Sequence, residues 1–106
     1  MTQLDLHAGF QRADFALALG KPAEAARILQ GVVDAEPTNQ AAVEALARAY
    51  FGAAQLGRAE EVLTRLVDLA PANAWARWAL ARTLERQSRP DDATVHHRVA
   101  DALGAA

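Results

Sequence analysis

Residues 33–39 read VDAEPTN, and residues 67–73 read VDLAPAN. Valine, aspartate, proline and asparagine recur in both stretches, and each pair, such as Pro37 and Pro71, lies 34 residues apart. A constant step of a few tens of residues is typical of proteins built from stacked structural repeats. The step predicts three units in this chain, at about 6–39, 40–73 and 74–106.

The composition favours helices. The chain has 106 residues, of which 52% are hydrophobic and 23% charged, and this fits one globular domain over residues 1–106. Alanine is abundant, together with leucine, glutamate, arginine and glutamine, and these residues lose little on entering a helix. We therefore expect an all-α fold.

Charge and residue types argue against several classes of partner. With 11 basic and 13 acidic side chains the net charge is -2, which does not favour a nucleic acid partner. Cysteine is absent, so disulfides and thiolate metal sites are impossible. No apolar run approaches the roughly 20 residues of a membrane span, and the N-terminus lacks the pattern of a secretory signal. The expected location is cytoplasmic, with no membrane partner.

The sequence also lacks the residue groups of an active site. There is no glycine-rich phosphate loop, no cysteine nucleophile and no Ser–His–acid grouping that the repeats would bring together. Acidic pairs, such as Asp91 and Asp92, fall at predicted helix starts, where they stabilise the helix dipole. We therefore expect no enzyme activity, no cofactor and no metal site.

Proline, glycine and asparagine divide the chain into six predicted helices. Pro22 suits a first helical turn, because proline needs no N–H partner there. Gly20 suits a helix end, Thr38 or Asn39 suits the N-cap of the third helix, and Asn73 suits the N-cap of the fifth. The fourth helix is predicted to begin near residue 58. The gaps between helices are only a few residues long, so neighbouring helices must form antiparallel hairpins.

Aligning the three rows at the common step places the same residue types in columns. Small residues recur in the first helices and again in the second helices: Ala13, Ala47 and Ala81, then Ala25, Ala59 and Ala93. This pattern resembles that of the tetratricopeptide repeat (TPR) family. The middle row matches the family best, with Val43, Leu46, Ala47, Tyr50, Ala59, Leu63 and Pro71. The first row departs from the pattern at Gly9 and Arg12, and the third departs from it at Arg77 and His97.

The resemblance covers roughly residues 6–106. It implies a right-handed α-solenoid of three antiparallel helix hairpins. In that family the first helices line a concave groove and the second helices form the convex back. The resemblance therefore implies a non-catalytic adaptor that binds a segment of a protein partner in this groove.

Side chains on the outward face of each first helix form the candidate groove. They are Phe10 and Asp14 in the first row, Glu44, Arg48 and Phe51 in the second, and Trp75, Trp78, Arg82 and Arg86 in the third. Aromatic and arginine side chains often anchor protein interfaces, and arginine binds carboxylates through two hydrogen bonds. We expect an extended or helical segment with at least one acidic and one bulky apolar side chain. Alternatively, the tryptophans pack on the preceding hairpin and the arginines are only solvated.

One known activity of the family does not fit these residues. Some TPR proteins hold the acidic C-terminal tails of heat-shock chaperones with a clamp of five Lys, Asn and Arg side chains on the first helices. The matching positions here are Phe10, Asp14, Ala45, Trp75 and Ala79, and none is of the required type.

The predicted C-terminal helix leaves further possibilities open. We interpret His96 and His97 as a polar end of the stack, with metal binding or pH sensing as the alternative. Adjacent helix residues diverge by about 100°, so the two rings cannot easily share one metal ion. Val95, Val99 and Leu103 form an apolar arc on the same helix. Self-association through this end or through the tryptophan face, as a structural homodimer, is the main alternative function.

Overall fold

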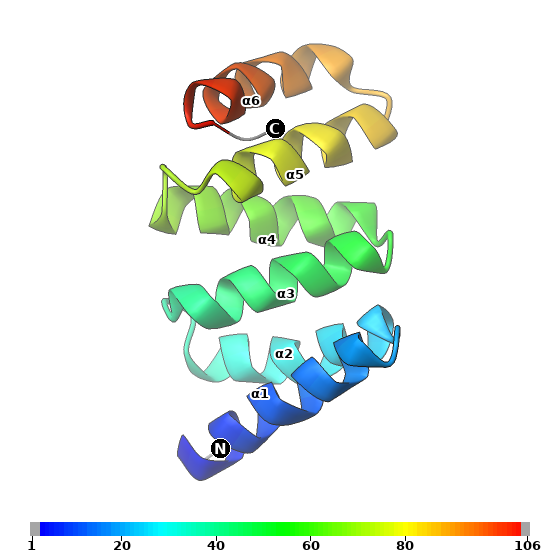
Figure 1. Cartoon of the computed structure of the whole chain (residues 1–106), viewed down its shortest axis with the longest axis vertical. Helices are drawn as coiled ribbons and strands as arrows, with labels where there is room; N and C mark the ends of the chain where they lie inside the picture. The colour runs from blue at the N-terminus through cyan, green and yellow to red at the C-terminus, as the bar shows by residue number, and fades with distance from the viewer. Residues whose placement is uncertain (1–2, 105–106) are drawn as a thin grey trace.

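The computed structural model describes residues 3–104, with side chains described from residue 6, and this part of the chain forms six α-helices. They are α1 (Gln3–Ala18), α2 (Pro22–Ala35), α3 (Gln40–Gly52), α4 (Leu56–Leu69), α5 (Ala74–Arg86) and α6 (Pro90–Ala102). The helices stack into a body of 41 × 23 × 21 Å, with α1 and α6 at opposite ends (Figure 1). The predicted all-α stack of three hairpins is confirmed. The end of the third predicted repeat, 105–106, lies outside the described residues.

Packing runs along the stack from one helix to the next. Each helix packs on its neighbours in sequence, so α2 covers α3 and α4 covers α5, and α3 also touches α5. The buried side chains form one continuous core, in which Leu29, Leu46 and Leu63 are among the largest that are fully buried. Each hairpin of such a stack is therefore stabilised by the next one.

The alanine columns lie inside this core. All six alanines of the two columns are at most 1% exposed. Gly9 is likewise a small residue at a close contact between helices, because a Cβ added to it would lie only 3.1 Å from Cγ2 of Val32. A larger residue at this position of the first hairpin would therefore require the Val32 side chain to shift.

The asparagine caps are confirmed, and one helix start was predicted wrongly. The side-chain oxygens of Asn39 and Asn73 accept hydrogen bonds from the backbone N–H groups three residues later, at 3.1 and 3.0 Å. Helix α4 begins at Leu56 rather than near residue 58. The carbonyl of Gln55 already accepts a helical hydrogen bond from Ala59, at 2.8 Å, so the glycine in the first turn does not delay the start.

The turn inside each hairpin repeats one backbone conformation. Gly20, Ala54 and Ser88 follow each other at the repeat step and have positive φ angles of 72°, 56° and 61°. In each turn the next N–H group bonds back to the carbonyl five residues earlier, at 2.8 to 3.1 Å, which closes the helix end. The left-handed conformation is unfavourable for residues with a Cβ, so two of the three turns are strained.

Relieving this strain should stabilise the protein. We expect Ala54→Gly to raise the free energy of unfolding by about 0.5–1 kcal/mol, because the relief exceeds the added entropy of the unfolded chain. The adjacent Ala53 has a φ of -81°, so Ala53→Gly should instead lower the free energy of unfolding by about 0.5–1 kcal/mol. Urea denaturation of both variants measures the two values, and a destabilised Ala54→Gly protein would contradict this account.

Candidate functional site

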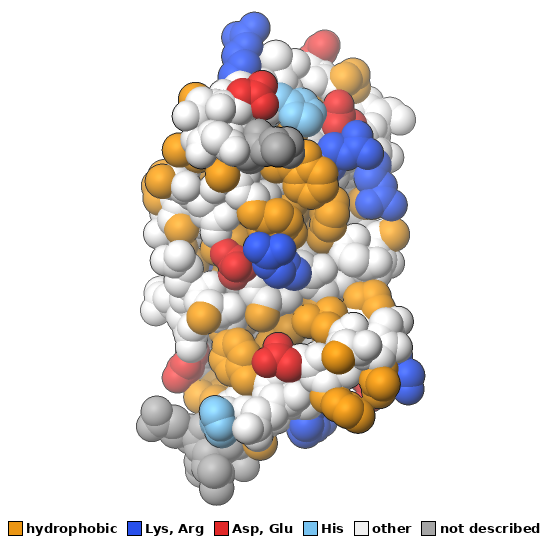
Figure 2. Space-filling model, in the orientation of Figure 1, with side chains coloured by type: hydrophobic (Ala, Val, Ile, Leu, Met, Phe, Trp, Pro, Cys, Tyr) orange, Lys and Arg blue, Asp and Glu red, His pale blue; other side chains and the backbone are white. Residues whose placement is uncertain are grey.

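An aromatic cluster joins the first helices of the second and third hairpins. Phe51 of α3 meets both tryptophans of α5 edge-on, with ring centroids 6.1 Å from Trp75 and 5.7 Å from Trp78. All three side chains are half-buried and pack against the core. Figure 2 shows hydrophobic side chains gathered on this level of the stack, with acidic and basic groups beside them. One side of the cluster therefore packs on the core, and the other side faces solvent.

Polar side chains extend this cluster along the same two helices. The guanidinium carbon of Arg48 lies 3.9 Å from the ring centroid of Trp75, a distance typical of a cation–π contact. Arg48 also pairs with Glu44 at 3.5 Å, and Glu44 accepts a 2.6 Å hydrogen bond from the side chain of Asn73. Asn73 therefore caps α5 and ties it to α3 as well. About half of the Arg48 side chain, 47%, remains exposed.

The basic residues further along α5 lie at the surface. Arg82 pairs with Glu85 at 3.2 Å and keeps 49% of its side chain exposed. Glu85 is also 3.2 Å from Nε2 of His97, and this hydrogen bond lowers the pKa of the Glu85 carboxyl below its ordinary value. Arg86 is exposed in the last turn of α5. Both arginine side chains of α5 therefore face solvent.

The predicted groove residues fall into three groups. Glu44, Arg48, Phe51 and the two tryptophans form the connected cluster, and the two arginines follow it on α5. Phe10 and Asp14 lie on α1, where the phenylalanine is half-buried against the core and the aspartate is exposed. The tryptophans do pack on the preceding hairpin, as the alternative interpretation expected, yet they are only half-buried.

The third hairpin has a polar pair inside its seam. Arg77 and His96 take the positions that Val43 and Val62 occupy in the second hairpin, and Nη1 of Arg77 lies 3.3 Å from Nδ1 of His96. Nε of Arg77 is buried without a hydrogen-bond partner among the described residues. Burial, together with the charge of Arg77 and then that of His97, lowers the pKa of His96. The two histidines therefore contact α5 rather than only covering the end of the stack.

This pair should make stability depend on pH. Because the pKa of His96 is lowered in the folded protein, the unfolded chain binds the proton more readily. The contribution of neutral His96 to the free energy of unfolding is therefore complete above the ordinary histidine pKa and is lost as the pH falls below it. We therefore expect His96→Val to flatten the decline of unfolding free energy on acidification, measured by urea denaturation at several pH values. An unchanged slope would contradict the assignment.

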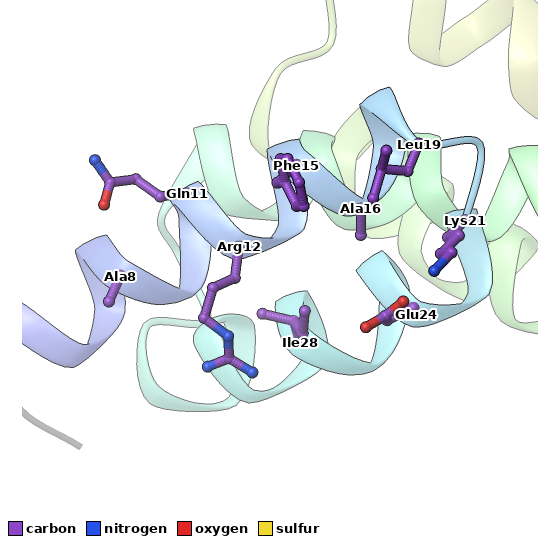
Figure 3. A pocket seen from close by; sticks show the side chains of 9 residues that line it. All are labelled: Ala8, Gln11, Arg12, Phe15, Ala16, Leu19, Lys21, Glu24 and Ile28. Atoms are coloured by element: carbon purple, nitrogen blue, oxygen red, sulfur yellow. The ribbon is translucent and has the colours of Figure 1, made fainter.

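A second surface feature, not predicted from the sequence, lies at the other end of the stack. A hollow of about 450 Å³ opens between α1 and α2 (Figure 3). We call it the N-terminal hollow, and its lining includes Arg12, Phe15, Leu19, Glu24 and Ile28. The alignment of the three rows contained a signal for this hollow, because Phe15 lies in the same column as the smaller Ala49 and Thr83.

Two other kinds of site have no support in the described residues. Within residues 3–104, His, Asp and Glu side chains form no group of three that could hold a metal ion. No helix in the same range is both long and apolar enough to cross a membrane.

Comparison with known proteins identifies the family. The model of the tetratricopeptide repeat family matches residues 16–71, which is more than half of the chain. The chain belongs to the tetratricopeptide repeat family. No curated protein sequence matches it.

Solved structures that resemble the chain include forms of MamA. MamA from Desulfovibrio magneticus RS-1 is 26% identical over 92% of this chain, with a TM-score of 0.83. A second form, MamA MSR-1, is 20% identical over 95% of this chain, with a TM-score of 0.85, a likeness that shows the fold alone. This chain spans 55% of the first MamA chain and 59% of the second.

Proposed function

We propose that this protein is a non-catalytic TPR adaptor whose groove on the first helices binds a segment of a protein partner. The carrying observation is the half-buried cluster of Phe51, Trp75 and Trp78 with Arg48 stacked beside it. Buried anchors of protein interfaces are most often tryptophan, tyrosine and arginine, set in packed surroundings that exclude water. The cytoplasmic location expected from the sequence stays a prediction.

The cluster suits a ligand with one bulky apolar side chain. Its rings already pack on one another and on the core, so little side-chain entropy is lost when a ligand covers them. An apolar side chain laid on the edges of Phe51 and Trp78 would remove the remaining aromatic surface from water. This burial supplies the hydrophobic part of the proposed affinity.

The charges suit an acidic group on the same ligand and give it a direction. Arg48 stacks on the aromatic cluster and Arg82 and Arg86 follow on α5, whereas the acidic Asp14 lies on α1. A carboxylate near the α5 end would meet the exposed arginine side chains, and a carboxylate near α1 would be repelled. We therefore propose that the partner's acidic residue lies over α5.

Selection from a library of random peptides tests this proposal. Immobilised protein should enrich peptides in which an aspartate or glutamate lies within a few residues of a bulky apolar residue. Binding of the enriched peptides should change the fluorescence of the protein, whose only two tryptophans are Trp75 and Trp78. Enriched peptides that leave this fluorescence unchanged, or that are basic, would argue against the groove.

A further inference from the structure

Helix α1 exposes large apolar side chains on the face that borders the N-terminal hollow. Phe15 of α1 is 67% exposed, and Leu19, in the turn after the helix, is 54% exposed. On the neighbouring face of the same helix, Gly9, Ala13 and Ala16 are buried, and this face packs on α2. Helix α1 therefore has one covered face and one exposed apolar face.

The repeats show what covers the exposed face in the other two hairpins. Phe15 occupies the column of Ala49 and Thr83, and both of these residues are 0% exposed. Helix α1 packs on α2 as α3 packs on α4, so the cover that Phe15 lacks is the preceding helix, which is α2 for α3 and α4 for α5. Ile28 is likewise only partly buried, whereas Val62 in its column is 7% exposed. The first hairpin therefore exposes a surface that elsewhere in this chain receives an α-helix.

The exposed surface is long enough for a helix to lie along it. Two further hollows, of about 320 and 420 Å³, adjoin the N-terminal hollow, and all three share Arg12 and Ile28. We call the three hollows together the N-terminal trough. On α1 its lining runs from Ala8 to Leu19, about three helical turns. Amphipathic helices bind grooves of this kind through apolar side chains that lie three and four residues apart.

The charged side chains of the N-terminal trough are mostly basic. Arg12, Lys21 and Arg27 line it, together with one acid, Glu24. Figure 3 shows Arg12 and Glu24 on either side of Ile28. Among the described residues, none of these four charged groups forms a salt bridge. The trough therefore favours a helix that carries acidic side chains next to its apolar ones.

The opposite end of the stack is polar at the equivalent positions. On α2 the face toward α3 is marked by Gln30, whose side-chain oxygen accepts a 2.7 Å hydrogen bond from the hydroxyl of Tyr50. Val33 lies three residues later on the same face and is 0% exposed. On α6 the same two columns hold Arg98 and Asp101, and both are exposed. Helix α6 of a second copy would therefore offer the trough charged groups where α2 offers α3 an apolar one.

We propose that the N-terminal trough binds an amphipathic α-helix of a different protein, with acidic side chains beside its apolar stripe. The helix occupies the place on α1 that α2 occupies on α3. Because Phe15 stands where α3 has an alanine, the helix presents a small side chain opposite this ring. Neither Trp75 nor Trp78 takes part, so this surface is independent of the peptide groove, and one molecule can bind two partners at once.

Selection from a library of helical peptides tests the proposal. The library has an alanine-rich scaffold of about 18 residues with one randomised face, because alanine favours the helix. Parallel selections use the wild type and a blocked variant, Phe15→Gln with Leu19→Gln, whose circular dichroism should be unchanged because both side chains are exposed. The wild type should enrich peptides with an apolar stripe flanked by aspartate or glutamate. The blocked variant should bind these peptides on the order of tenfold or more weakly.

A pair of charge variants tests the acidic preference. Arg12→Glu with Arg27→Glu should weaken binding of the enriched peptides roughly tenfold. The matched control is Arg65→Glu with Arg98→Glu, which makes the same change in net charge at exposed positions outside the trough and should bind like the wild type. A proline in the middle of an enriched peptide should abolish binding, because it breaks the helix. Tryptophan fluorescence of the protein should not change on binding.

Several outcomes would overturn the proposal. Equal enrichment by the wild type and the blocked variant would show that the peptides bind elsewhere. Basic peptides, or binding that survives the proline, would exclude an acidic helix as the occupant. Sedimentation velocity covers the remaining case. A wild type that self-associates at micromolar concentration, while the blocked variant stays monomeric, would assign the trough to a second copy of this chain instead of a different protein.

Discussion

Leu63→Ala is expected to lower the free energy of unfolding by about 2–5 kcal/mol, the usual cost of deleting a fully buried leucine side chain. Leu63 is 0% exposed in α4, in the middle of the stack. The change leaves a cavity in the hairpin that both outer hairpins pack against. Because a domain of this size is stable by roughly 5–15 kcal/mol, this one change removes a large share of the total.

The same chemical change at the surface serves as the control. Leu19 is 54% exposed, so Leu19→Ala should change the unfolding free energy by less than about 1 kcal/mol. Urea denaturation at micromolar concentration gives both values without interference from self-association. Equal effects at the two positions would contradict the assignment of a continuous core through α4.

Trp78→Ala should cause the largest loss of peptide affinity, about 2–4 kcal/mol or roughly 30-fold to 1000-fold in dissociation constant, the range found for anchors of protein interfaces. The ring lies 5.7 Å from that of Phe51 and is half-buried, so its removal takes away contact area in the groove. Arg82→Ala should cost less, because this side chain is 49% exposed and screened by water. Isothermal titration with a selected peptide measures both changes.

The controls for this prediction separate binding from folding. Circular dichroism should remain helical in Trp78→Ala and in the double variant with Arg82→Ala, because the leucines and valines of the core are untouched. Arg65→Ala removes an arginine from α4, a second helix, and should leave peptide affinity unchanged. Undiminished affinity in the double variant would remove the groove as the binding surface.

The fold was predictable because its signals are local and repeated. The two alanine columns, the asparagine caps and the prolines all recur at the same 34-residue step. A coincidental agreement of so many positions with the repeat pattern is therefore improbable. Gly20 gave the position of one hairpin turn. Ala54 and Ser88 did not reveal theirs, because neither residue is typical of the left-handed conformation that the turn imposes on them.

The candidate site was less predictable, because it depends on distances between hairpins. The sequence placed Phe51, Trp75 and Trp78 on outward faces, but it could not show that the rings bury one another. The N-terminal hollow was missed for a related reason. Phe15 differs in size from Ala49 and Thr83 in the same column, but this difference alone does not show whether the side chain is covered by a neighbouring helix.

Titration of the protein with a selected peptide, followed in two-dimensional ¹H–¹⁵N NMR spectra, tests the central claim most directly. The chain has only two tryptophans, so it gives two indole N–H signals that report on the groove alone. We predict that both signals shift and saturate together with the backbone signals of α3 and α5. Indole signals that stay fixed while those of α2, α4 or α6 shift would contradict the account.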